Sequence, residues 1–270
     1  MTLIESSVAA NGINLHVYRT NTDKPPLLFV HGRSDNGLCF WPIAQQFADA
    51  YEIILYDARS HGQSANPESP TNLMDRVQDL AGLIQALDLH KPKLVGHSLG
   101  AVTVALLAGT YPLLPGCIVL EDPPPFDLMA ADSEQARAGH REWEKFIEAI
   151  KEKSIQELAE WNRRESPSWP EAEREPWAQS KRQYHLRPFG EDRIDAALGN
   201  QIVSHITCRT LLITAEQDKG AIYSPEAADE LVARLPHARH VHIPGAGHNI
   251  RREQPEAYVT AVRDFLQSCS

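Results

Sequence analysis

The sequence lacks most features that mark membrane, secreted or nucleic-acid-binding proteins. No apolar run approaches the roughly 18 residues needed to cross a bilayer, and Met1–Glu5 carries neither the basic stretch nor the apolar core of a signal peptide. No run of like charges stands out. The net charge of −10 disfavours a polyanionic partner, because phosphate binding needs clustered lysine and arginine. We therefore expect a soluble, cytoplasmic protein with no membrane or nucleic-acid partner.

Cysteine is also scarce, with four residues in a chain of 270, all widely separated. Cys117 and Cys208 fall at or just before apolar, strand-like runs, which is typical of buried free thiols. A cytoplasmic chain of this length seldom needs disulfides to be stable, so none is expected.

Short apolar runs alternate with helical segments over most of the chain, whose composition is 42% hydrophobic and 23% charged. Most of the runs are continuously apolar, which indicates strands buried on both faces in a mostly parallel sheet. Ile4–Ala10 and Ile13–Arg19, joined by Asn11-Gly12, predict an antiparallel hairpin. The other expected strands are Leu27–Val30, Ile53–Tyr56, Lys93–Val95, Cys117–Leu120, Arg209–Thr214 and His240–Ile243, and the expected helices between and after them are Phe40–Ala48, Leu73–Leu87, Leu99–Tyr111, Pro225–Leu235 and Gln254–Gln267.

Residues 123–205 interrupt this α/β pattern, because no strand is evident there. Three amphipathic helices are predicted instead, at Ser133–Lys151, Ser154–Glu165 and Pro170–His185. Residues 1–122 and 206–270 would form the core domain, and the insertion would form a helical lid.

The predicted lid holds four of the five tryptophans. We expect most of these rings to pack the lid helices together and one or two to reach a substrate. The candidates for substrate contact are Trp143, Trp161 and Trp169.

The most informative stretch is Gly96-His97-Ser98-Leu99-Gly100, which follows an apolar strand and opens a helix. In this context Gly-x-Ser-x-Gly predicts a sharp turn that projects the Ser98 hydroxyl above the sheet as a nucleophile. The two glycines allow the backbone to close tightly. The N-terminus of the following helix favours negative charge at the site.

A serine nucleophile needs a general base, and His248 is the best placed of twelve histidines. It follows the last predicted strand, at the sheet edge where active sites of open α/β folds gather. His97 adjoins Ser98, but neighbours on a tight turn point apart. His240 and His242 share one strand face and could pair on a metal, although a packed or solvated face is the simpler interpretation.

The base needs a carboxylate to fix its tautomer. Asp218 lies just beyond a strand in the chain order serine, acid, histidine, and is the preferred candidate. Glu121, at the end of the preceding strand, is the rival.

Attack on an acyl carbon also requires two N–H donors for the oxyanion. Leu99 would supply one, and Arg33, in the loop after the third strand, would supply the other. Gly32 would allow the close backbone approach. The alternative is a plain turn, with His31 only bracing the loop.

These motifs resemble the α/β-hydrolase superfamily, specifically its lid-bearing esterase, lactonase and haloperoxidase-like branch. The resemblance implies an eight-stranded sheet, a helical lid after the sixth strand, and a Ser98–Asp218–His248 triad. Some relatives place the acid after the sixth strand, which keeps Glu121 open. The family usually has glycine where Ser60 stands, which puts that local turn in doubt. The resemblance rests on His31-Gly32, Asp57–Ser64, Gly96–Gly100, Asp218 and Gly247-His248.

The expected function is hydrolysis of a small or medium carboxylic ester or lactone through an acyl-enzyme. Amidase, C–C hydrolase and perhydrolase or haloperoxidase-like activities with the same triad stay open, as does a ligand receptor with little turnover. The elbow serine argues against dehalogenases and epoxide hydrolases, which use aspartate there. The sequence has no metal-lactonase His-x-His-x-Asp-His cluster and no glycine-rich nucleotide motif after a strand, so neither metal nor cofactor is expected. The oligomeric state is not readable from the sequence.

Overall fold

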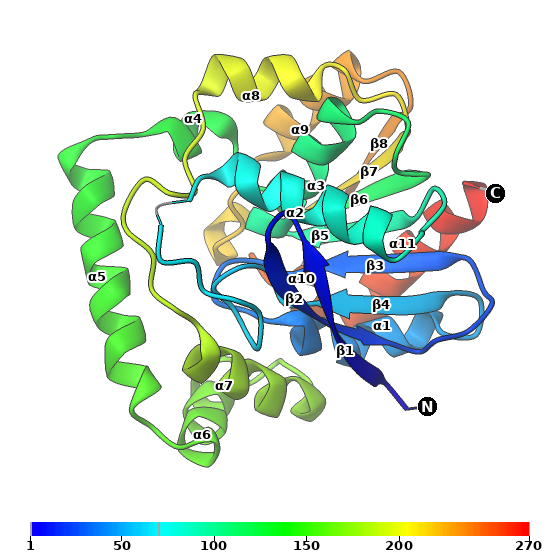
Figure 1. Cartoon of the computed structure of the whole chain (residues 1–270). Coiled ribbons are helices and arrows are strands. Elements are labelled where there is room, and N and C mark those ends of the chain that lie inside the picture. The colour runs from blue at the N-terminus through cyan, green and yellow to red at the C-terminus, as the bar shows by residue number, and fades with distance from the viewer. Residues whose placement is uncertain (1, 70, 270) are drawn as a thin grey trace.

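An eight-stranded sheet forms the centre of the molecule in the computed structural model, which describes residues 2–69 and 71–269. Its strand order is β1-β2-β4-β3-β5-β6-β7-β8 (Figure 1). The pairs β1·β2 and β2·β4 are antiparallel and all later pairs are parallel, so the predicted fold class is confirmed. The strands are β1 Ile4–Ala10, β2 Ile13–Arg19, β3 Pro26–Val30, β4 Glu52–Tyr56, β5 Lys93–His97, β6 Cys117–Glu121, β7 Arg209–Thr214 and β8 Ala238–His242.

The predicted hairpin is present, with Ala10 paired to Ile13 across the turn. Asn11 and Gly12 both have positive φ, 49° and 77°. A two-residue turn of this kind matches the twist of the two strands, and asparagine and glycine adopt it at low cost.

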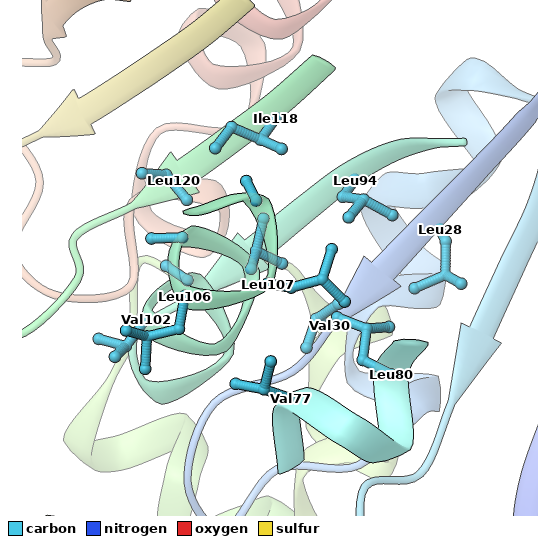
Figure 2. Packing of buried hydrophobic residues seen from close by; sticks show 14 of the residues in the cluster. Leu28, Val30, Val77, Leu80, Leu94, Val102, Leu106, Leu107, Ile118 and Leu120 are labelled. Atoms are coloured by element: carbon cyan, nitrogen blue, oxygen red, sulfur yellow. The ribbon is translucent and has the colours of Figure 1, made fainter. Parts of the chain in front are cut away.

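Helices cover both faces of the sheet. Strand side chains alternate between the two sides: Leu28, Leu94 and Ile118 pack with α2 and α3, as Figure 2 shows for one side. Leu27 and Val95 pack on the opposite side with α1 and α11. The helices are α1 Trp41–Ala44, α2 Leu73–Ala86, α3 Leu99–Thr110, α4 Phe126–Ala130, α5 Glu134–Lys151, α6 Ile155–Glu165, α7 Arg174–Gln183, α8 Ala196–Val203, α9 Pro225–Arg234, α10 Ile250–Glu253 and α11 Pro255–Ser268, with 3-10 turns at η1 Gly37–Phe40, η2 Gln45–Phe47, η3 Glu171–Glu173 and η4 Gln217–Lys219.

Two predicted helices are shorter or more broken than expected. The segment Phe40–Ala48 consists of a single α-turn flanked by 3-10 turns. The segment Pro170–His185 begins with a 3-10 turn and becomes α-helical only from Arg174.

The chain between β6 and β7 contains helices α4–α8 and, within that fully described stretch, no strand. Helices α5–α7 lie to one side of the sheet (Figure 1) and share their own apolar cluster, built on Ile147, Leu158 and Trp177. Helix α8 is different, because Val203 packs into the main core with α3 and the backbone of Ile202 lies against Gly109. The separately packed part of the insertion is therefore α5–α7.

All four cysteines are free, with Cys117 buried and Cys208 half-buried. Within the described residues, no helix combines the length and apolar character needed to cross a membrane.

Candidate active site

Ser98 occupies the sharp turn between β5 and α3. Its backbone has φ 53° and ψ −124°, a conformation that a non-glycine residue adopts only where its surroundings enforce it. The Ser98 N–H donates to the Glu121 carbonyl at 2.9 Å. A Cβ at position 96 would lie 2.6 Å from the Gly100 carbonyl oxygen, so only glycine fits there. The sequence forms the predicted elbow.

His248 pairs with Asp122, the residue that directly follows β6. The distance from His248 Nδ1 to Asp122 Oδ2 is 2.6 Å, and the Asp122 side chain is fully buried. The same carboxylate accepts the backbone N–H groups of Ile222 at 2.8 Å and Tyr223 at 2.9 Å. Because a carboxylate can only accept, it fixes the proton on Nδ1 and leaves Nε2 as the basic nitrogen.

The two acids predicted from the sequence are wrong as partners of His248. Asp218 is exposed on the 3-10 turn η4, and the loop after β7 contributes the N–H groups of Ile222 and Tyr223 instead of a carboxylate. Glu121 is the last residue of β6, and its side chain accepts the Arg251 backbone N–H at 3.0 Å. Asp122 has a positive φ of 40°, so the backbone leaves the extended strand conformation at this residue.

Glu121 belongs to a buried ionic network, three members of which, Asp35, Lys181 and Arg252, line the cavity that contains His248. Arg251 lies 3.4 Å from Glu121 and 3.1 Å from Asp35. Arg252 and Lys181 each lie 3.0 Å from Asp35. Burial by itself would raise the pKa of Asp35, but Arg252, Lys181 and Arg251 hold that pKa well below its usual range. Lys181 belongs to α7, so the network ties the insertion to the core.

His97 and His31 are both committed to backbone contacts. His97 Nε2 lies 2.9 Å from the His248 carbonyl oxygen and positions the loop that carries the base. His31 bridges the Gly32 carbonyl through Nδ1, at 2.8 Å, and the Ala58 N–H through Nε2, at 2.9 Å. Burial lowers the pKa of both rings, that of His31 to about 4, so both are neutral at pH 7. The structure confirms the bracing contact expected of His31.

The loop after β3 lies directly against the elbow. A Cβ on Gly32 would lie 2.9 Å from His97 Nδ1 and 3.1 Å from Ser98 Cβ, so glycine permits this approach. In the described part of the chain, the N–H groups of Leu99 and Arg33 donate to no protein acceptor. Both predicted oxyanion donors are therefore available.

Two cavities meet at Ser98. One, of about 390 Å³, is lined by Leu99 and by apolar residues such as Met129 and Ile222. The other, of about 310 Å³, is lined by His248, and both are lined by Arg33 and Trp143.

The candidate tryptophans reach these cavities. Trp143 lines both, whereas Trp161 and Trp169 line the one that contains His248. The same rings also pack the insertion: Trp161 stacks on Trp177 with centroids 5.6 Å apart, and Trp169 is 9% exposed. The same tryptophan side chains therefore pack the insertion and line the cavities.

The backbone conformation at Ser60 explains why members of the family usually have glycine at this position. Ser60 has φ 65°, in the left-handed region that glycine adopts at least cost. The turn is held by Asp57, whose carboxylate accepts the N–H groups of Gly37 and Gln63, each at 2.8 Å. The departure from the family pattern leaves the turn intact.

Comparison with known proteins defines the family. Residues 27–261 match the alpha/beta hydrolase family, and the chain belongs to it. A 2-(acetamidomethylene)succinate hydrolase of Mesorhizobium japonicum is 36% identical over 135 residues, which span 50% of this chain and 48% of that protein. A putative esterase/lipase of Haemophilus influenzae is 23% identical over 93% of this chain and 86% of its own length.

Solved structures of several hydrolases share the fold. The structure of E-2-(acetamidomethylene)succinate hydrolase superposes with a TM-score of 0.75 at 24% identity, covering 98% of this chain and 99% of that one. An enol-lactonase from Burkholderia xenovorans gives a TM-score of 0.71 at 19% identity, over 97% of this chain and 100% of that one. The neighbours are hydrolases, esterases and lactonases.

Proposed function

We propose that the protein is a serine hydrolase that cleaves a carboxylic ester or lactone through an acyl-enzyme, with Ser98, His248 and Asp122 as its triad. The observation that carries the proposal is the buried Asp122 carboxylate 2.6 Å from Nδ1 of His248, a residue that lines the same cavity as Ser98. This pairing is the acid–base half of a triad, and Ser98 stands on the strained turn typical of its nucleophile.

In the proposed reaction, His248 Nε2 takes the proton from the Ser98 hydroxyl as its oxygen attacks the acyl carbon. The N–H groups of Leu99 and Arg33 hold the negative carbonyl oxygen. His248 then gives the proton to the departing alkoxide, and the alcohol leaves. Water repeats the sequence on the acyl-enzyme and releases the acid.

The two cavities suggest how the substrate divides at Ser98. The leaving group must lie near His248, which protonates it, and that residue lines only the 310 Å³ cavity. The acyl group would then occupy the 390 Å³ cavity beside Leu99. Helices α5–α7 would act as the lid over both, and Trp143, which lines both, is the tryptophan best placed to contact substrate. A cytoplasmic location remains a prediction, for which cell fractionation is the test.

The test is hydrolysis of a panel of methyl esters and lactones by the wild type and by Ser98→Ala. We expect turnover by the wild type and a loss on the order of 10³-fold or more in kcat for the variant, because triad residues act as a unit. Amides and C–C substrates in the same panel separate the alternative chemistries. A folded wild type that turns over none of these compounds would contradict the proposal and favour a ligand receptor.

A further inference from the structure

Arg33 carries an unused set of hydrogen-bond donors beside the nucleophile. Its side chain is 38% exposed, and Arg33 lines both cavities that meet at Ser98. Within the described residues this guanidinium makes one hydrogen bond, from Nη2 to Asp192 at 2.8 Å. Arginine has five N–H donors in a fixed planar fork, so most of them remain free to face a ligand.

The guanidinium is also held in place before any ligand arrives. Asp192 fixes one edge, and the group lies over the Trp143 ring at 5.3 Å from the centroid. Such preorganisation reduces the entropy lost when an anion binds.

The positive charge of Arg33 and its neighbour Arg76 is only partly neutralised by Asp192. Asp192 is shared, because Arg76 Nε also donates to it at 3.0 Å, so two arginines face one carboxylate. Burial alone would raise the pKa of Asp192, but Arg76 and Arg33 lower it, which keeps the group ionised at neutral pH. The three residues therefore carry a net charge of about +1 beside the cavity, in a protein whose overall charge is −10.

The other cations that line these two cavities are Arg193, Lys181 and Arg252, and each already has several partners. Arg193 lies 3.0 Å from Asp132 and donates to the Ala130 carbonyl at 2.5 Å. Lys181 Nζ donates to Ser34 O at 2.8 Å, to Ser34 Oγ at 3.1 Å and to Asp35 at 3.0 Å, which uses all three of its protons. Arg252 is 1% exposed and bonds Glu173, Asn249 and Asp35. Arg33 is the most exposed of these four cations and has the fewest polar partners, so it is the best suited of them to bind an external anion.

From this geometry we infer that Arg33 binds a carboxylate on the acyl part of the substrate, so that the preferred substrates are half-esters of short dicarboxylic acids. The inference rests on the proposed function. Planar bidentate recognition by arginine suits a carboxylate. The chain between the ester carbonyl and this carboxylate must be short, because one residue supplies both the oxyanion N–H and the guanidinium.

The test compares monomethyl succinate with dimethyl succinate as substrates, by methanol release. We expect the wild type to prefer the monoanion in kcat/KM, per ester group, by on the order of ten- to hundredfold, the size of a charge-assisted contact. Arg33→Gln should abolish that ratio. Arg163→Gln, at a lid arginine paired with Glu171 on the surface, should preserve it. A ratio unchanged by Arg33→Gln would overturn the inference.

Two further experiments separate acyl-side from leaving-group binding, and failure of the inference from failure of the proposed function. If the acetate ester of glycolate, with its charge on the leaving group, shows the larger dependence on Arg33, the assignment to the acyl side is wrong. Calorimetry with Ser98→Ala measures binding without turnover, and monomethyl succinate should bind more tightly than the diester only while Arg33 is present. Arg33-dependent binding without any Ser98-dependent hydrolysis would contradict the proposed function but would still support the carboxylate site. Equal binding of both esters would contradict only the inference about Arg33.

Discussion

The proposed acyl transfer depends on the carboxylate of Asp122. It is fully buried and accepts hydrogen bonds from His248 and from two backbone N–H groups. Those two N–H groups orient the carboxylate, and the carboxylate orients the imidazole. In the proposed reaction this arrangement would stabilise the imidazolium that forms when Ser98 loses its proton.

Replacing Asp122 by asparagine tests this role. We expect kcat to fall on the order of 10³- to 10⁴-fold, because an amide no longer holds the Nδ1–H tautomer. Asp218→Asn, at an exposed position, is the matched control and should leave kcat within about twofold, as surface changes usually do. Steady-state kinetics on one methyl ester measures both, with thermal unfolding as the folding check. A severe loss in Asp218→Asn alone would reverse the assignment.

The sequence signals for Ser98 and His248 point to two loops that line one cavity in the structure, but neither the preferred acid, Asp218, nor its rival, Glu121, is the carboxylate that contacts His248. Glycines on both sides of Ser98 and the position of His248 after the last strand are local signals. By contrast, the local sequence does not show whether β6 ends at Glu121 or one residue later. The left-handed turn at Asp122 and the loop of Ile222 that meets it are set by tertiary packing. The position of a triad acid beyond its strand disfavours Glu121, which ends β6, but it does not choose between Asp218 and Asp122.

At the scale of elements, the elbow depends on how closely α3 approaches β3. Gly100 lies in the first turn of α3, and a Cβ there would overlap the carbonyl groups of Val30 and His31. Backbone atoms cannot move aside as a flexible side chain can. The site geometry therefore relies on this contact between helix and strand.

Gly100→Ala should destabilise the protein by about 1–3 kcal/mol through overpacking. Gly139→Ala is the matched control, because position 139 lies inside α5 with open space around its Cβ. That change should stabilise the protein by about 0.5–1 kcal/mol, since alanine favours helix over glycine. Urea denaturation measures both free energies of unfolding. Equal effects of the same sign at the two positions would contradict this account of the elbow.

The sequence predicted long, strongly patterned elements better than short ones. The hairpin, the parallel strands and helices α5 and α6 are confirmed within a few residues. Helices α4 and α8 were missed because they have five and eight residues, too few to show a periodic pattern. Their contacts with the main core, through Phe126 and Val203, come from tertiary packing.

At the scale of the whole molecule, several buried histidines make stability depend on pH. Burial lowers the pKa of His31 to about 4 and those of His61 and His97 well below 6.5. Between the folded and unfolded pKa values the unfolded chain binds more protons, so these residues lower the free energy of unfolding as pH falls. Glu121, whose pKa is raised by burial, acts in the opposite direction over its own range.

His31→Asn isolates one of these contributions. The free energy of unfolding of the wild type should fall more steeply than that of the variant from about pH 6.5 to about pH 4. The difference in slope should be about 1.4 kcal/mol per pH unit, the value for one proton. Glu121 is common to both proteins and cancels in the comparison. Urea titrations at a series of pH values give the two curves, and parallel curves over that window would show that His31 is not held neutral by folding.

The most direct measurement of the central claim is intact-mass spectrometry after treatment with a fluorophosphonate, followed by peptide mapping. We expect one adduct per chain, on Ser98, with no labelling of Ser98→Ala and much slower labelling of Asp122→Asn than of Asp218→Asn. An adduct that persists in Ser98→Ala, or a folded wild type that takes up none, would contradict that claim.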